Sequence, residues 1–203
     1  MGSRIMHAII ASKLADCLSI SDKKSFLRGG IAPDAVVQKD LSHFYKGKVE
    51  DYSREIDYNG FLQKYNVHLQ NHYILGYYSH LIADDIWLKG FYLPWLRNRM
   101  EEDPQILQLY HNDFRLLNGK LLEHYGFTNQ LKEEVHLGSV TIIDLEEVKT
   151  KEVEAFLSHV LGDMEYNKDC VNENLNVFTF DQIVGYIETS VDKSINLIKQ
   201  ILR

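Results

Sequence analysis

Apolar residues recur at spacings of three and four along most of the chain, which is the periodicity of amphipathic helices. The segments with the clearest periodicity are 3–19, 104–124, 145–162 and 179–202. In the last of these, the apolar stripe consists of Val184, Ile187, Val191, Ile195, Ile198 and Leu202. Stripes of this kind pack against one another and form a core. The pattern therefore predicts an all-α, single-domain multi-helix bundle over residues 1–203.

Residues with strong positional preferences mark where several helices begin and end. Ser3 suits the N-cap of the first helix, and Pro104 suits the first turn of the helix over 104–124. A shorter helix that starts near Ser21 is expected to end at Gly29-Gly30, because glycine often terminates helices.

The middle of the chain is less regular. Residues 35–56 lack a clear period, which is typical of a functional loop. A helical pattern over 59–91 breaks near Gln70-Asn71, and Pro94 interrupts the segment that follows. Residues 140–143 favour a short strand or an extended link.

The composition is typical of a helical globular protein and excludes some classes of partner. The 203 residues include only 3 Pro and 12 Gly, and the net charge is −7 without a long basic run. Duplex nucleic acid is therefore not expected as a partner, because neutralising its phosphates needs clustered Lys and Arg. No apolar stretch is long enough for a membrane span, and the first residues lack the apolar region of a signal peptide. We expect a cytoplasmic protein with two free thiols, Cys17 and Cys170.

His80 and Asp84 are the most informative pair in the sequence. They lie four residues apart in a run rich in aromatic and aliphatic residues, 76–87, which predicts a buried helix. At this spacing the two side chains share one helix face, where they can bind one metal ion together. An ionised carboxylate in an apolar environment needs a positively charged partner, and a metal ion is one such partner. The alternative is an aspartate that merely orients a histidine of the core.

Further candidates precede this pair: His7 in the first helix, Asp34 after Pro33, and His43 in the irregular segment. Taken singly, each has an ordinary explanation as a core histidine, a turn residue or a loop histidine. Taken together, histidine and carboxylate ligands suit zinc and similar divalent ions. His68 and His72 have polar neighbours, and we interpret them as surface residues or as residues that support the ligands.

The order of these residues resembles the bacterial zinc-dependent phospholipase C family, which is related to the fungal single-strand nucleases. The resemblance covers roughly residues 5–90 and consists of His7, the Gly-x-x-Pro-Asp motif ending at Asp34, then His43, then His80-x-x-x-Asp84. It implies an all-α fold around a metal cluster. It further implies that Asp34, His43, His80 and Asp84 hold one zinc ion, and that Asp84 bridges towards a second ion bound by His7.

The chain also departs from that family. Secreted members use a processed N-terminal tryptophan as a ligand, which has no counterpart here, and Gly90 stands where they carry a further histidine. A later histidine and glutamate pair has no clear match, and His111 is the candidate substitute. We therefore expect one or two zinc ions, or other divalent metals, rather than a cluster of three.

These observations predict a metal-dependent hydrolase that acts on a phosphoester, most simply a phosphodiester. Zinc lowers the pKa of bound water to roughly 7, and Asp34 is the expected catalytic residue that orients or deprotonates this water. Arg28 or Arg115 is expected to pair with the phosphate. The substrate is expected to be a small-molecule or lipid-like phosphoester, whereas the sequence does not indicate the oligomeric state.

The aromatic residues near the central pair fit either a substrate cleft or the core: Tyr77, Tyr78, Trp87, Phe91, Tyr92 and Trp95.

Two other functions compete with the hydrolase. A phosphohydrolase of the HD type requires adjacent His and Asp, and the sequence has no such dipeptide. A non-catalytic helical binding protein with a structural or vestigial metal site is the main alternative.

Overall fold

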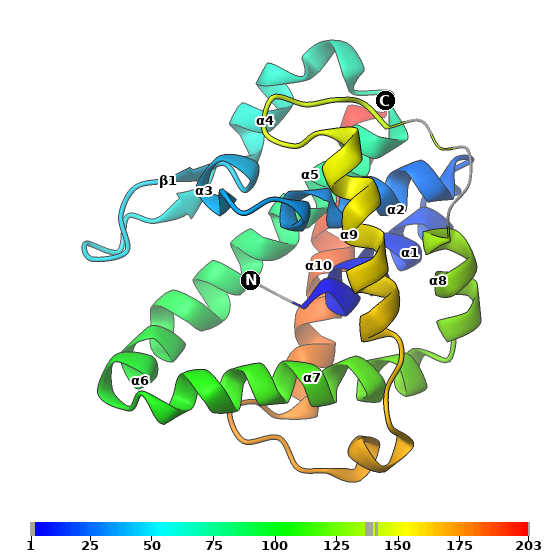
Figure 1. Cartoon of the computed structure of the whole chain (residues 1–203). Coiled ribbons are helices and arrows are strands. Elements are labelled where there is room, and N and C mark those ends of the chain that lie inside the picture. The colour runs from blue at the N-terminus through cyan, green and yellow to red at the C-terminus, as the bar shows by residue number, and fades with distance from the viewer. Residues whose placement is uncertain (1–2, 137–139, 141, 203) are drawn as a thin grey trace.

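The structure is a computed structural model that describes residues 3–136, 140 and 142–202 (Figure 1). Helices dominate it, which confirms the prediction of an all-α multi-helix fold. The helices of the first half are α1 (Arg4–Cys17), α2 (Lys23–Ile31), η1 (Ala32–Ala35), α3 (Lys39–Ser42), α4 (Tyr58–Lys64), η2 (Asn66–His68) and α5 (His72–Trp87). The second half contributes η3 (Leu88–Leu96), α6 (Arg97–Glu102), α7 (Gln105–Tyr125), α8 (Thr128–Val135), α9 (Thr150–Asp163), η4 (Lys168–Asn172) and α10 (Phe180–Ile201).

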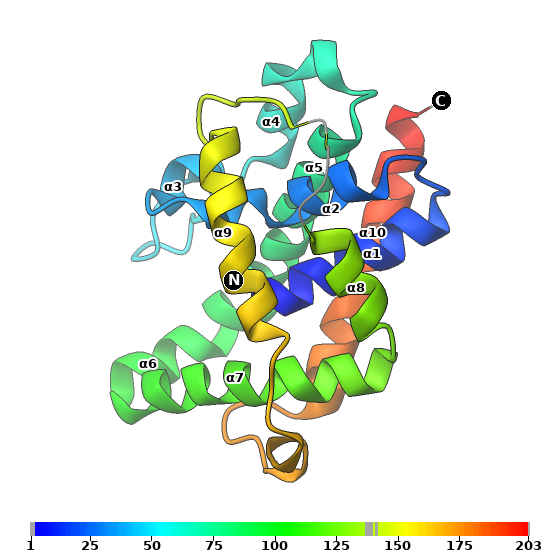
Figure 2. The ribbon, with the colours of Figure 1, turned by 45° about the vertical axis from the view of Figure 1, so that its right-hand side comes forward.

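Helix α5 occupies the centre of the core. Its residues from Tyr73 to Asp85 are all buried, so no face of this stretch is left for solvent. Helices α1, α2, α4 and α10 pack against it. In both views of the molecule, α7 crosses the base while α9 and α10 rise from it (Figures 1 and 2). One continuous cluster of buried apolar side chains joins these helices.

Glycines allow α2 and α5 to cross at very short range. A Cβ atom on Gly29 would lie 1.9 Å from the carbonyl oxygen of Tyr73, and one on Gly76 would lie 1.9 Å from that of Phe26. Gly29 and Gly30 were expected to end a helix, but both lie inside α2, which continues to Ile31. Their role is therefore close helix packing, because no larger residue fits between the two backbones.

Several predicted helix ends agree with the structure. Ser3 caps α1 by accepting a hydrogen bond from the amide of Met6 at 3.2 Å. Asn71 caps α5 at the predicted break, and Thr179, where the predicted segment 179–202 begins, caps α10. Pro104 directly precedes the first residue of α7. These ends are confirmed because capping depends on a few consecutive residues.

Other expectations need correction. Residues 35–56 contain α3 and a short antiparallel hairpin of β1 (Tyr45–Lys46) and β2 (Glu55–Ile56). The helix expected over 145–162 begins only at Thr150, because Lys149 and Glu152 form a capping arrangement at that point.

Pro94 does not interrupt its segment. The helix continues through Pro94 in the wider π form over η3. In a regular α-helix a proline removes one backbone hydrogen bond and clashes with the preceding turn, and the wider form relieves this clash. Of the residues expected as a strand or extended link, 140, 142 and 143 are in neither helix nor strand, and 141 lies outside the described residues. Among the described helices, none combines the length and apolar character that crossing a membrane requires.

Replacing Gly76 with alanine should destabilise the protein, because the new Cβ would overlap the backbone of α2. We expect the free energy of unfolding to fall by about 1–3 kcal/mol, measured by urea denaturation. The matched control is Gly185→Ala in α10, where a Cβ meets no atom within 4 Å. This control should raise stability by about 0.5–1 kcal/mol. Equal stability of the two variants would contradict the close crossing.

Candidate metal centre

Four segments bring five of the six predicted ligands together. Helix α1 supplies His7, η1 supplies Asp34, and His43 follows the last residue of α3. His80 and Asp84 lie one turn apart on α5. Two overlapping groups of potential ligand atoms result: His7, Asp34 and His80 in one, and His43, His80 and Asp84 in the other. Within each group, all ligand atoms lie within 4.8 Å of one another.

The second group has the dimensions of a tetrahedral zinc site. The Nε2 atoms of His43 and His80 are 3.2 Å apart. Asp84 Oδ2 lies 3.2 Å from the Nε2 of His43 and 3.5 Å from that of His80. Ligand atoms that are about 2.0–2.1 Å from a tetrahedral zinc ion lie roughly 3.3 Å from one another. The three atoms therefore form a triangle that fits one face of such a site.

Backbone carbonyls orient both imidazoles. His80 Nδ1 lies 2.8 Å from the carbonyl oxygen of Gly30, and His43 Nδ1 lies 3.1 Å from that of Lys39. A carbonyl oxygen only accepts, so each Nδ1 carries the proton and donates it. In the neutral imidazoles, both Nε2 atoms then direct lone pairs towards each other and towards Asp84. Hydrogen bonds of this kind fix the tautomer of histidines that bind metals.

Asp84 contacts histidines through both of its oxygens. Its Oδ2 faces His43 and His80, and its Oδ1 lies 3.2 Å from the Nε2 of His7. The rings of His7 and His80 stack with their centroids 3.7 Å apart. A carboxylate whose two oxygens face different histidines is suited to bridging two ions. The number of ions stays a prediction.

The pKa values within this cluster favour ionised carboxylates beside a protonated His43. Burial opposes ionisation of His43, but hydrogen bonds with Asp34 and Asp84 outweigh burial and raise its pKa to about 9. Burial and the nearby His7 lower the pKa of His80 to about 4. Burial alone would raise the pKa of Asp84, but surrounding positive charge and hydrogen bonds from histidines hold it well below its usual value. His43 thus carries a proton in the metal-free protein at neutral pH, and a divalent ion can replace that proton.

Asp34 connects the buried cluster to an open cavity. His7, His43, His80 and Asp84 are almost completely buried, whereas the side chain of Asp34 is 15% exposed. Asp34 Oδ1 lies 3.6 Å from His43 Nε2. Its pKa is also lowered: burial acts in the opposite direction, but the hydrogen bond from His43 and the charges of the histidines prevail. The residue can therefore contact a buried ion and a ligand in the cavity at once.

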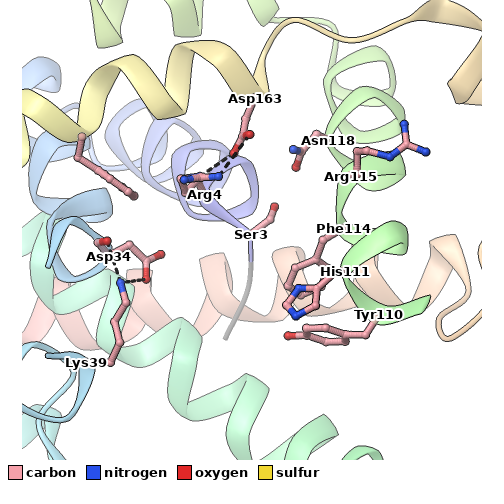
Figure 3. A pocket seen from close by; sticks show the side chains of 11 residues that line it. Ser3, Arg4, Asp34, Lys39, Tyr110, His111, Phe114, Arg115, Asn118 and Asp163 are labelled. Atoms are coloured by element: carbon pink, nitrogen blue, oxygen red, sulfur yellow. Dashed lines mark hydrogen bonds and ion pairs between the residues drawn. The ribbon is translucent and has the colours of Figure 1, made fainter. Parts of the chain in front are cut away.

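The cavity has a volume of about 440 Å³ and carries several cationic side chains (Figure 3). The Nζ of Lys39 donates to Asp34, at 3.1 Å to Oδ1 and at 2.7 Å to the backbone oxygen. Arg4 pairs with Asp163 at 2.6 Å. Arg115 lies on the opposite wall, where it donates to Asn112. Lys39 and Arg4 are thus paired with carboxylates of the same lining, whereas Arg115 has no carboxylate partner among the described ion pairs and can compensate a negatively charged ligand.

Other residues named from the sequence lie elsewhere. His111 is exposed on α7, across the cavity from Asp34 (Figure 3), and belongs to neither group of potential ligands. Its proposed role as a ligand stays a prediction. Arg28 is buried and donates to the carbonyl oxygens of Val135 and His136, so it serves the packing of α8 rather than this cavity. His68 is exposed on η2.

Lys39, Arg4 and Asp163 were not anticipated as residues of the site. Arg4 lies one helical turn before His7, which is a signal that the sequence did contain. Lys39 stands in an irregular stretch, and Asp163 ends a helix more than a hundred residues away. No local pattern indicates that these last two side chains contact the same cavity.

No protein-family model matches the chain, and no similar protein was found among curated proteins or solved structures. The resemblance to the zinc-dependent phospholipase C family therefore stays a prediction.

Removing a ligand should weaken zinc binding strongly. Partners that only orient ligands contribute roughly 10–100-fold to metal affinity, so we expect His80→Ala and Asp84→Ala each to cost at least about 100-fold. Isothermal titration calorimetry measures this loss. His68→Ala is the matched control and should bind zinc as the natural protein does, because His68 is exposed on η2. Equal affinity of the His80 and His68 variants would rule out this centre.

Zinc binding should release a proton at neutral pH. His43, with a pKa of about 9, is protonated in the metal-free protein at pH 7. An imidazole must be neutral to bind a metal, so binding displaces this proton. Calorimetry in buffers of different ionisation enthalpy should show about one proton released from this group at pH 7. The release should decline as the pH rises past 9, and a release independent of pH would contradict the assignment.

Proposed function

We propose that this protein is a metal-dependent hydrolase of phosphoesters, most simply phosphodiesters, with zinc as the ion. The observation that carries the proposal is a buried set of histidine and aspartate ligands beside a cationic cavity, with Asp34 shared between the two. The fit of the ligand triangle supports zinc, and the resemblance to the zinc-dependent phospholipase C family points to the same chemistry. A cytoplasmic location remains part of the same proposal.

A divalent ion in this centre supplies Lewis acidity and lowers the pKa of water, which is the chemistry that phosphoester hydrolysis needs. His7, His43 and His80 would act as neutral ligands, and Asp84 would bind the ion and fix the geometry of the site. Asp34 would bind the ion and orient the attacking water, because its carboxylate lies at the boundary between the buried cluster and the cavity.

The cavity supplies the groups that recognise the phosphate. Lys39 lies beside Asp34, so its ammonium group can contact an oxygen of a bound phosphoester. Arg115 reaches the cavity from α7 and has no carboxylate partner among the described ion pairs. Cationic side chains that are already in position before the reaction stabilise the negative charge that develops in the transition state.

Burial favours one competing function. Four of the five potential ligands are almost completely buried, and a structural metal site is closed to substrate, whereas a catalytic one keeps a position open. A non-catalytic helical binding protein with a structural or vestigial metal site would have this property. The exposure of Asp34 to the cavity favours the hydrolase, since a closed site has no need of it.

Asp34→Asn should reduce kcat/KM for bis-p-nitrophenyl phosphate by at least roughly 100-fold, because it removes the carboxylate that orients the attacking water. The assay compares zinc-loaded and chelator-treated protein, and the chelator should abolish turnover. The matched control is Asp192→Asn, an exposed position on α10, which should keep full activity.

The same samples separate the two functions. Phospholipids and nucleotide diesters are tested alongside bis-p-nitrophenyl phosphate. If zinc raises the melting temperature but no phosphoester is hydrolysed, the site is structural and the hydrolase proposal fails. Turnover that persists in the presence of chelator would also contradict it.

A further inference from the structure

A second cavity adjoins the cationic one and differs from it in character. Its volume is about 380 Å³, and it lies between the β1–β2 hairpin region and the segment from η3 to α7. The apolar side chains that line it include Leu88, Tyr92, Leu96, Met100, Leu107 and Tyr110. The charge in its wall is largely paired, because Arg54 donates to Asp40 at 2.6 Å and stacks over Tyr45. This cavity therefore suits an uncharged ligand group.

The two cavities share part of their lining. Lys39, Tyr110 and His111 line both of them. Lys39 stands at this boundary with its Nζ against Asp34. A molecule that contacts Lys39 can thus extend into the apolar cavity on one side while it faces Asp34 on the other.

We propose that the apolar cavity binds a single hydrophobic substituent of a phosphoester whose phosphate group lies against Lys39. The inference rests on the proposed function and deepens it, because it names the class of substrate. The volume lies near the lower end of the range of about 300–1,000 Å³ for small-molecule sites. One alkyl chain or aromatic group fits such a volume, and a pair of long acyl chains does not.

The rim of the cavity provides a site for a specific test. Leu107 lies in the first turn of α7, lines the cavity and is 50% exposed. An aspartate there is compatible with folding, because acidic residues are favourable near a helix N-terminus. It would place a negative charge at the entrance of an apolar site. Leu202 is similarly exposed, at 41%, and lines neither cavity, so Leu202→Asp is the matched control.

The experiment measures binding of octylphosphonate and methylphosphonate by calorimetry, with and without zinc. These compounds are not hydrolysed, so the readout does not depend on turnover. Each buried methylene gains roughly fourfold in affinity, and we expect octylphosphonate to bind at least tenfold more tightly than methylphosphonate. Leu107→Asp should reduce this ratio about tenfold, and Leu202→Asp should leave it unchanged. Lys39→Gln should weaken both ligands roughly tenfold and keep the ratio.

The outcomes distinguish the inference from the proposed function. A ratio near one in the natural protein, or equal effects of the Leu107 and Leu202 variants, overturns the apolar site even if phosphodiesters are hydrolysed. Selective binding of octylphosphonate that is lost in Leu107→Asp supports the site, even if no phosphoester is turned over and the hydrolase proposal fails. A Lys39→Gln variant that binds both phosphonates normally overturns the position assigned to the phosphate.

Discussion

The buried carboxylate of Asp84 is the constraint on which the centre of this structure depends. An ionised carboxylate in an apolar interior is stable only when positive charge or hydrogen-bond donors surround it. Three imidazoles from separate helical segments contact its two oxygens. Two of them have their Nδ1 protons committed to backbone carbonyls, so their free nitrogens and the carboxylate converge as acceptors. A cation fits where these acceptors meet: a proton on His43 in the metal-free protein, or a metal ion in the proposed centre.

The close crossing of α2 and α5 makes this convergence possible. Gly29 and Gly76 let the two backbones approach without side chains between them. The carbonyl of Gly30 consequently reaches His80 and orients its ring. The end of α2 leads directly into η1, which carries Asp34 to the edge of the cluster. The packing of α2 against α5 therefore sets the positions of the potential ligands, because a displacement between these helices also displaces His80 and Asp34.

The site combines a dry interior with an accessible surface. Most of the potential ligands are inaccessible to solvent, which strengthens their mutual electrostatic interactions. Asp34 and Lys39 form the boundary, beyond which lie a cationic cavity and an apolar one. In the proposed hydrolase, this division would separate the buried ligands of an ion from the cavities that recognise a substrate, with Asp34 shared between the two.

The sequence by itself determined the helical class, the N-cap at Ser3, the break near Asn71 and the pairing of His80 with Asp84, because all of these depend on residues within one or two turns. The order of His7, Asp34 and His43 indicated a shared site through a family pattern rather than through geometry. Only the tertiary structure decided that Gly29 and Gly30 serve a helix crossing, that Arg28 is used in packing, and that Lys39 joins two cavities. Such contacts link residues distant in the chain, and local periodicity carries no information about which backbones will approach each other.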